Sequence, residues 1–521
     1  MDEEKDIIRL LPEKKKSITS ILFSRFAIMA LVILLQIILI FAVVKIFEDN
    51  TRYMAVINLC FSLALVLYLF NKEMDSSAKL TWLVIVLLFP IPGAVFMWFT
   101  QTDVANRDIK LKVAKAIKES KRRLAQDPEI INAPDMISSG TSSLCQYLNK
   151  RGCFPCYGNT DVTFFPLGEY KFEAMIEELE KAKSFIFMEY FIIDEGYMWG
   201  RILSVLAEKA AQGVDVRVMY DGMCEMSSLS ADYPKRLEKL GIKSKPFSPI
   251  TPMLSTYYNY RDHRKILVID GQVAFNGGVN LADEYINKIE RFGHWKDTAV
   301  MLKGEAVQSF TLMFLQMWNI SNPRASWREV YIPSKPEKAQ GYVMPYSDSP
   351  LNGEKIGECV YMDILNRAKS YVHIMTPYLI LDDELEGALK FAAGRGVDVR
   401  IILPGIPDKK LAYSLAKKHY SSLIKDGVKI YEYTPGFCHA KVFVSDDEKA
   451  VVGTINLDYR SLYHHFECAT YMYNTSCIAD IERDYQATLE KCRQVTKETI
   501  KNEKLTMKIL GSIAKIFAPL M

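Results

Sequence analysis

The sequence lacks an excess of charge of either sign. Its 65 lysine and arginine residues nearly balance 62 aspartate and glutamate residues, which leaves a formal net charge of +3 over 521 residues. Proteins that bind nucleic acid neutralise backbone phosphates with many basic residues. The global charge gives no support to that class, and no nucleic-acid partner is expected. The length is sufficient for two or three domains.

The ten cysteines follow no framework. Cys153 and Cys156 form a single C-x-x-C pair, and no second pair of this spacing completes a zinc site. Free thiols in a reducing compartment are therefore the favoured interpretation. The polar residues also lack a carboxylate cluster of the kind that holds Mg²⁺. We predict neither a metal nor another cofactor.

Apolar residues are concentrated at the N-terminal end, and residues 1–104 are predicted to form a membrane region. It contains three apolar runs, at about residues 21–47, 54–71 and 80–100. A helix that crosses a bilayer needs about 20 apolar residues. Pro90, Pro92 and Gly93 interrupt the third run and predict a kink or a re-entrant turn there. A cleaved signal peptide is disfavoured, because the first run is too long and no small-x-small site follows it.

Basic residues crowd between Arg107 and Arg123, directly after the third run. By the positive-inside rule this side of the membrane is cytoplasmic, and the bulk of the chain lies with it. Lys14 to Lys16 indicate the same side for the N-terminus, which three crossings do not allow. Residues 105–134 are predicted to be a basic linker. The linker is either an amphipathic helix on an anionic surface or a solvated helix, and the sequence leaves both open.

From about residue 160 the chain alternates short apolar strands with helical stretches, and it repeats itself. Gly213–Arg217 has the same sequence as Gly396–Arg400. Self-similarity at a long period indicates duplication of one unit, and the alternation is typical of packed α/β layers. We predict an α/β fold of two duplicated halves, residues 135–330 and 331–521, which pack together as one catalytic unit.

The repeat includes a motif that carries chemistry, H-x-K-x-x-x-x-D. It occurs as His263, Lys265 and Asp270 and again as His439, Lys441 and Asp446, and in each copy an asparagine, Asn280 or Asn456, follows the histidine by seventeen residues. Alternate side chains of a strand share one face, so each histidine points the same way as its lysine. Two such pairs face to face would form a cationic pocket for a phosphate.

That pocket suits phosphoryl transfer through a covalent enzyme. One neutral histidine attacks phosphorus, and the other, protonated, gives its proton to the leaving alkoxide. The lysines and the two asparagines stabilise the phosphoryl oxygens as negative charge builds on them.

Each imidazole also needs an acceptor at its second nitrogen. From the alignment of the two repeats we assign Asp297 to His263 and Glu467 to His439. Surface acids at strand starts are the alternative interpretation of both carboxylates. 

Other polar residues receive secondary roles. Asp270 and Asp446 end their strands and are expected to cap turns and shape the site rather than to transfer protons. His294 and His465 lie near the two acids in the sequence and are candidates to line the pocket.

The duplicated motif resembles the phospholipase D superfamily. From about residue 20 onward the chain is similar to one branch of it, the bacterial cardiolipin synthases. That narrower resemblance rests on the apolar N-terminal runs and on the segments Lys79–Trp82, Glu189–Ile192, Asn259–Lys265, Gly277–Asn280 and Asn456–Ser461. The family usually has asparagine before the second Phe-Glu pair, where this chain has His465.

The resemblance implies transfer of a phosphatidyl group from one phosphatidylglycerol to another through a phosphatidyl-histidine, at a bacterial membrane rich in anionic lipid. The family's catalytic triplets fall on His263, Lys265 and Asp270, and on His439, Lys441 and Asp446. The resemblance favours His263 as the nucleophile. A membrane-bound phospholipase D that hydrolyses its lipid and an inactive membrane scaffold are the competing functions. The oligomeric state stays open.

Overall fold

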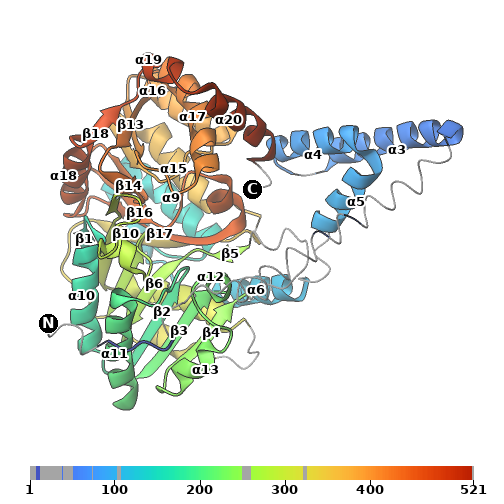
Figure 1. The fold of residues 1–521 in the computed structure, drawn as a ribbon. Coiled ribbons are helices and arrows are strands. Elements are labelled where there is room, and N and C mark those ends of the chain that lie inside the picture. The colour runs from blue at the N-terminus through green and yellow to red at the C-terminus, as the bar shows by residue number, and fades with distance from the viewer. Residues whose placement is uncertain are drawn as a thin grey trace.

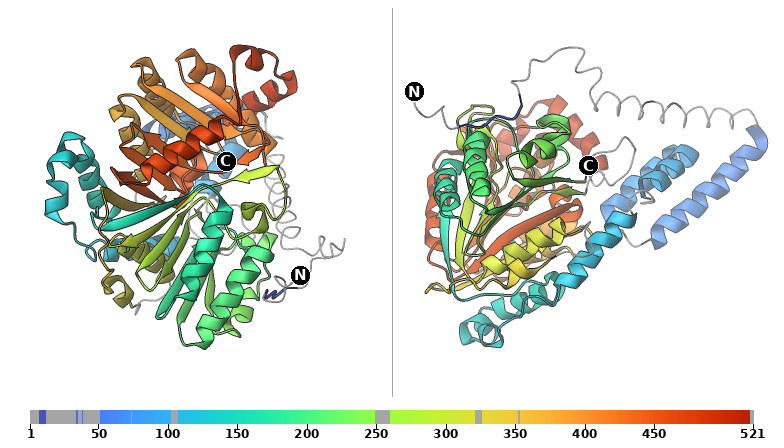
Figure 2. Two further views of the ribbon diagram at one scale, coloured as in Figure 1. Left: turned by 90° about the vertical axis from the view of Figure 1, so that its left-hand side faces the viewer. Right: turned by 90° about the horizontal axis from the view of Figure 1, so that it is seen from below.

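Two α/β halves and a helical arm make up the computed structural model (Figure 1). The structure describes residues 7–11, 51–72, 74–101, 107–248, 260–320, 326–351 and 353–518, together with Leu34 and Ile38. Each half is built on one mixed sheet, and the arm projects away from both halves (Figure 2).

The sheet of the first half has seven strands in the order β1-β9-β7-β6-β2-β3-β4. β2, β3 and β4 run parallel, and the other neighbours are antiparallel. Its strands are β1 (Thr160–Phe165), β2 (Phe185–Tyr190), β3 (Asp215–Asp221), β4 (Lys243–Phe247), β6 (Lys265–Ile269), β7 (Val273–Gly277) and β9 (Ala299–Gly304). Its main helices are α10 (Gly168–Glu180), α11 (Tyr197–Ala211) and α14 (Val307–Trp318).

The sheet of the second half repeats this topology. Its order β10-β17-β16-β15-β11-β12-β13 matches the first sheet strand for strand, and β18 extends the far edge. The duplicated α/β prediction is therefore confirmed. The strands are β10 (Tyr342–Asp348), β11 (Tyr371–Met375), β12 (Asp398–Pro404), β13 (Lys429–Tyr433), β15 (Val442–Ser445), β16 (Lys449–Gly453), β17 (His465–Tyr473) and β18 (Cys492–Gln494). The main helices are α15 (Ile356–Arg367), α16 (Asp383–Gly394), α17 (Lys410–Lys425) and α18 (Ile478–Leu489).

Burial on both faces explains why the central strands are so apolar. All six residues of β2 are buried. Phe187 stacks on Phe314 of α14, with ring centroids 4.6 Å apart, while Ile186 belongs to the apolar cluster that includes α11. A strand covered on both faces has a nearly continuous apolar sequence.

Short strands from each half cross over to the other half. β5 (Arg261–Asp262) adds in parallel to β17, so that Arg261 pairs with His465. β14 (Gly436–Cys438) pairs in parallel with β8 (His294–Lys296). These two exchanges join the halves next to the two motif histidines.

The segment at the start of the predicted first half also contacts the second half. The predicted first half begins with three short helices. They are α8 (Pro134–Ser138), α9 (Thr141–Tyr147) and the π-helix η1 (Leu148–Gly152). Their buried side chains join an apolar cluster that both halves share. The backbone of Tyr157 bonds that of Val343 on β10 in both directions at 2.9 Å. That bridge ties the segment to the edge strand of the second sheet.

The linker helix α6 (Arg107–Ser120) turns its apolar face toward protein. It packs on α14, and Val113 is 1% exposed. The Gln316 side chain of α14 donates a hydrogen bond to the Ser120 hydroxyl. One face of α6 thus packs on the body, whereas Leu111 is 60% exposed.

The helical arm holds the second and third apolar runs. α3 (Thr51–Asn71) is followed by α4 (Ser76–Leu88) and α5 (Pro90–Gln101). The predicted break at Pro90 is confirmed, since proline is tolerated in the first turn of a helix but not in its interior. The third run is therefore two short helices and not one crossing helix. Within the described ranges no helix combines the length and apolar content needed to cross a bilayer. The predicted helix at 21–47 lies outside the described residues except for Leu34 and Ile38.

The two aspartates of the motifs cap turns at the far ends of their strands, as expected. The Asp270 carboxylate accepts hydrogen bonds from the backbone N–H groups of Lys183, Ser184 and Phe185 at 2.7–2.8 Å. Asp446 accepts the equivalent three from Lys369, Ser370 and Tyr371 at 2.8–2.9 Å. Each aspartate ties the start of a parallel strand to a motif hairpin.

Replacing Asp446 by alanine should therefore affect stability and not chemistry. Three backbone donors lose a charged acceptor, so about 2 kcal/mol of unfolding free energy should be lost, while activity per folded molecule is retained. Thermal unfolding and an activity assay on the same preparation measure both. The control is Asp447→Ala, because Asp447 also has a positive φ but its carboxylate accepts only from the Tyr371 hydroxyl. An active-site role would appear as lost activity at unchanged stability.

Candidate active site

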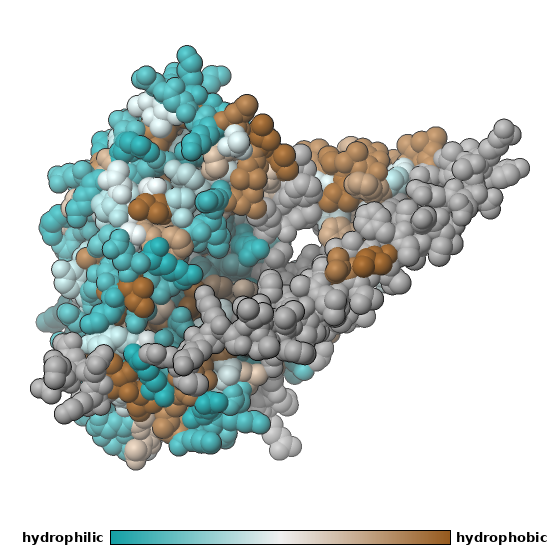
Figure 3. Space-filling view, viewed as in Figure 1, coloured by the Kyte–Doolittle hydropathy of each residue, from teal (hydrophilic) through white to brown (hydrophobic). Residues whose placement is uncertain are grey.

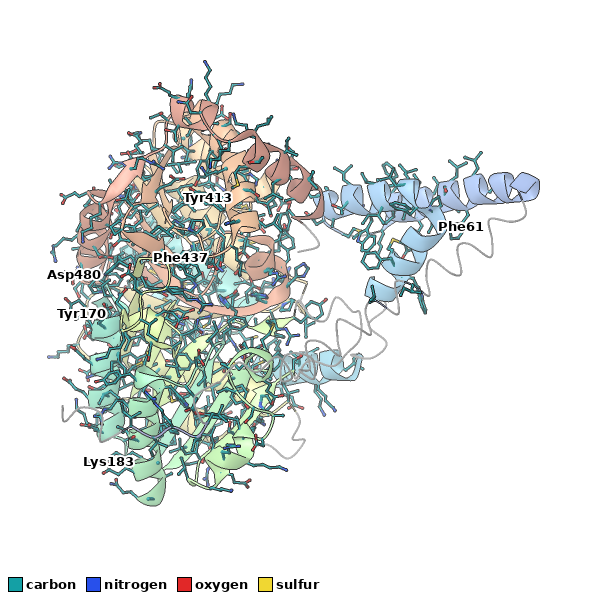
Figure 4. The ribbon with its side chains drawn as sticks, in the orientation of Figure 1. Phe61, Tyr170, Lys183, Tyr413, Phe437 and Asp480 are labelled. Carbon is teal, nitrogen blue, oxygen red and sulfur yellow. The ribbon has the colours of Figure 1, made fainter. Side chains whose placement is uncertain are left out.

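A cavity of about 320 Å³ lies between the two halves and contains both motif histidines. Aromatic rings from both halves line it, among them Trp295 of β8 and Phe437 of β14, and Figure 4 shows Phe437 where the halves meet. The polar side chains in its wall include His263, Asn280, His439, Asn456 and His465. The structure thus brings together two histidines that lie 176 positions apart in the chain.

His263 is held by the second half. It follows β5, and its backbone N–H donates to the Phe466 carbonyl at 2.9 Å. Its ring Nδ1 lies 2.9 and 3.0 Å from the two carboxylate oxygens of Glu467. Burial alone would raise the pKa of Glu467, but His263 beside it outweighs burial and holds that pKa well below its usual range. An ionised carboxylate only accepts hydrogen bonds, so Nδ1 carries the proton and Nε2 is left for the cavity.

His439 is held by the first half in the same way. Its backbone N–H donates to the Lys296 carbonyl at 2.7 Å, and its Nδ1 lies 2.6 Å from Asp297 Oδ2. Burial and the neighbouring Lys441 lower the pKa of His439 to about 4. Burial likewise holds the pKa of His263 well below its ordinary value. Both imidazoles are therefore neutral at pH 7.

The predicted pairing of histidines and acids is wrong, because the partners are exchanged. Asp297 serves His439, and Glu467 serves His263. The cause is the pair of strand exchanges: β5 lies beside β17, which carries Glu467, and β14 lies beside β8, which ends one residue before Asp297. Alignment of the repeats identified the right acids but not which copy each would serve.

The two motif lysines lie behind their histidines, fully buried. Lys265 Nζ donates to the His263 carbonyl at 2.6 Å, and Lys441 Nζ donates to the His439 carbonyl. Burial lowers the pKa of Lys265 to about 7 and that of Lys441 to about 8. A bound anion favours the charged form of both lysines. The positive charge of the site therefore increases when a phosphate binds.

The two asparagines are not equivalent. The Asn280 carbonyl accepts from the Ile192 N–H at 3.0 Å, and its amide donates to the Tyr285 hydroxyl at 2.8 Å. In Asn456 the side-chain oxygen is buried and has no hydrogen-bond partner among the described residues. Asn456 therefore has more hydrogen-bonding capacity left for a ligand than Asn280 has.

Of the two candidate pocket histidines, only His465 lines the cavity. Its ring centroid is 5.3 Å from that of His263, and its Nδ1 is 3.5 Å from Glu467 Oε1. Neither ring nitrogen has a hydrogen-bond partner within the described chain. His294 instead bonds the Tyr433 hydroxyl at 3.1 Å, outside the cavity lining.

Sequence reasoning missed several cavity residues, among them Tyr285, Asp458 and Arg460. Asp458 and Arg460 belong to the segment after Asn456 that carried the family resemblance, so a signal for them existed. Tyr285 had none, although its ring lines the cavity and lies 5.5 Å from that of His439.

His263, His465 and Glu467 are also the residues of the site that could hold a metal ion, since their donor atoms lie within 4.8 Å of one another. Two imidazoles and one carboxylate suit zinc rather than magnesium. An ion there would occupy His263 itself and compete with its use as a nucleophile.

Comparison with known proteins gives a consistent picture. The family model described as "Cardiolipin synthase, PLD-like domain" matches residues 175–318 and 361–489. An uncharacterised protein of Streptococcus mutans is 60% identical over 88% of this chain and 99% of its own length. Cardiolipin synthases of Alkalihalophilus pseudofirmus and Bacillus anthracis are each 32% identical, over 87% and 88% of this chain and 91% and 90% of their own.

Among solved structures, a phosphatidylserine synthase of Haemophilus influenzae superposes with a TM-score of 0.55. The match covers 73% of this chain and 97% of that one at 16% sequence identity. At this identity the likeness concerns the fold alone.

The exchanged pairing predicts which histidine responds when one acid is removed. A carboxylate beside an imidazole raises its pKa, so Asp297→Asn should lower the pKa of His439 and leave that of His263 unchanged. Glu467→Gln should do the reverse. Titration of ring-labelled histidine by NMR measures both, with His419, which pairs with Glu386 elsewhere at 2.7 Å, as the internal reference. A response of His263 to Asp297→Asn would restore the pairing predicted from the repeat.

Proposed function

The chain belongs to the PLD-like cardiolipin synthase family, and we propose that it transfers a phosphatidyl group from one phosphatidylglycerol to another, with release of glycerol. The observation that carries the proposal is the pair of imidazoles in one cavity, each held at Nδ1 by a carboxylate of the opposite half. Both Nε2 atoms are thereby free for phosphorus chemistry.

In the first step, His263 Nε2 attacks the phosphorus of the donor lipid. A nitrogen–phosphorus bond forms and the bond from phosphorus to the glycerol oxygen breaks. His439, protonated once the phosphodiester anion is bound beside it, gives its proton to the departing glycerol oxygen. The products are free glycerol and a phosphatidyl-histidine, and His439 is left neutral.

In the second step, neutral His439 removes the proton from a glycerol hydroxyl of the second phosphatidylglycerol. That oxygen attacks phosphorus, and the bond to His263 breaks. Cardiolipin leaves, and His263 and His439 return to their first state. Asp297 and Glu467 stay ionised throughout and hold the two tautomers.

Lys265 and Lys441 supply the positive charge that the phosphoryl oxygens need as the transition state forms. Their lowered pKa values, about 7 and 8, let the site hold little charge when empty and gain charge with the bound anion. The buried Asn456 adds a neutral polar group in the cavity wall.

We place the protein at the bacterial cell membrane, with the catalytic halves in the cytoplasm. The support is the exposed apolar surface of α3, where Leu63, Leu67 and Phe70 are 56–67% exposed, because extensive exposed apolar surface marks a lipid or protein contact. The described N-terminal residues 7–11 contact the catalytic body: the Ile8 N–H donates to the Gly200 carbonyl at 3.3 Å. The N-terminal residues 7–11 and the catalytic body therefore lie on the same side of the membrane in this proposal.

The direct test supplies the purified full chain with phosphatidylglycerol and identifies the products by mass spectrometry. Equal amounts of cardiolipin and glycerol are expected. Phosphatidic acid in place of cardiolipin would show that water is the acceptor and would make the protein a hydrolase. Absence of turnover across lipid compositions would favour the scaffold.

The same assay separates the two histidines from their neighbours. His263→Ala and His439→Ala should each reduce turnover by about a thousandfold or more, since each residue acts in both steps. His294→Ala is the matched control, because His294 lies near the site but outside the cavity lining, and it should retain most activity. Near-normal turnover in either motif variant would contradict the two-histidine mechanism.

A further inference from the structure

The C-terminal helix α20 (Leu505–Phe517) carries an apolar stripe that the described chain does not cover. Leu505, Ile509 and Ile513 are 70%, 52% and 54% exposed and lie one turn apart, on one face. The other face is packed: Ala514 and Ala518 are buried with Leu415 of α17.

The orientation of α20 on the body is fixed by a close backbone approach. A side-chain carbon added at Gly511 would come within 2.5 Å of the Ser414 carbonyl oxygen of α17. The two helices therefore touch at Gly511, and rotation that would turn the exposed stripe inward would replace this contact with larger side chains. Within the described ranges, no residue covers the stripe.

The stripe lies next to the apolar helical arm. Tyr459 packs against Ala514 and Ala518 of α20, and its hydroxyl lies close enough to the Ser77 side chain of α4 to affect the pKa of Tyr459. α4 in turn exposes Leu80, Leu87 and Leu88 at 61–67%. Figure 3 shows apolar residues at the α20 edge of the body and on the neighbouring arm. One tyrosine thus joins two exposed apolar surfaces.

The charge of α20 indicates which kind of partner its apolar stripe contacts. α20 contains Lys508 and Lys515, Lys504 precedes it, and the helix has no acidic residue. A helix with an apolar stripe and flanking lysines suits the headgroup region of an anionic bilayer. A second copy of the chain would bring like charges together on the same stripe.

We propose that α20 lies in the headgroup region of an anionic phospholipid bilayer and, beside α4, sets the mouth of the catalytic cavity at the membrane surface. Asp458 and Arg460, the two neighbours of Tyr459, line the cavity. The residue that joins the two apolar surfaces is therefore one position from the cavity wall on each side. The inference deepens the proposed lipid transferase function and rests on it for the identity of the bilayer.

The contact is tested by spin labels on the full chain reconstituted in vesicles of phosphatidylglycerol and phosphatidylcholine. Cys60→Ser removes the exposed native thiol. Labels are placed by Ile513→Cys on α20, by Ile137→Cys as a control of the same residue type and 59% exposure, and by Phe61→Cys on α3. Accessibility to oxygen, which concentrates in lipid, is compared with accessibility to a water-soluble nickel complex.

The label at 513 should favour oxygen several-fold more than the label at 137, and the label at 61 should favour it most. Equal behaviour at 513 and 137 would overturn the proposal. Dipolar coupling between labels at 513, with shielding from both reagents, would also overturn it in favour of a second copy. The same preference in vesicles without phosphatidylglycerol would refute the anionic selectivity.

An activity assay on two substrates tests the membrane role of α20 separately from the proposed activity. Ile513→Asp should lower turnover of phosphatidylglycerol in vesicles about tenfold, because it places a charge in the apolar stripe, and leave turnover of a water-soluble short-chain phosphatidylglycerol unchanged. Ile137→Asp should change neither. An equal loss on both substrates would refute the membrane role of α20. If the wild-type chain turns over neither substrate, the proposed activity fails while the label result stands.

Discussion

The structure depends on one interaction made twice, an imidazole held at Nδ1 by a buried carboxylate from the other half. The His439–Asp297 contact is 2.6 Å and the His263–Glu467 contacts are 2.9 and 3.0 Å. Neither half contains a complete pair, so the duplicated halves form one site only when packed together. The exchanged strands β5 and β14 are the parts of the fold that enforce this.

Burying so many ionisable groups is costly unless each has a partner or loses its charge. Here both acids keep their charge because an imidazole faces each of them, and burial keeps the histidines neutral and lowers the pKa of both lysines. Arg264, directly after His263, is 1% exposed and paired with Glu189 and Asp262. The site is thus poised to gain positive charge when an anionic phosphodiester arrives.

Much of this was predictable from the sequence, for identifiable reasons. The repeated Gly-Val-Asp-Val-Arg segment indicated duplication. The expected strand alternation of histidine and lysine is not seen, because His263 and His439 both lie in short breaks between two strands. Pro90 marked the break between α4 and α5, since proline constrains the backbone locally. The exchange of Asp297 and Glu467 was not predictable, because repeat alignment is symmetric and strand exchange is a tertiary event. The packing of 134–152 on the second half was hidden for the same reason. Spacing did not distinguish His465, which lines the cavity, from His294, which does not.

The central claim is that one histidine carries the phosphatidyl group while the other moves the proton. Rapid acid quench of the full chain with isotope-labelled phosphatidylglycerol, followed by digestion and mass spectrometry, tests it directly. The account predicts a phosphatidyl adduct on the peptide that contains His263 and none on the peptide that contains His439. An adduct on His439 in the wild-type chain, or product formation with no adduct at any quench time, would contradict the account.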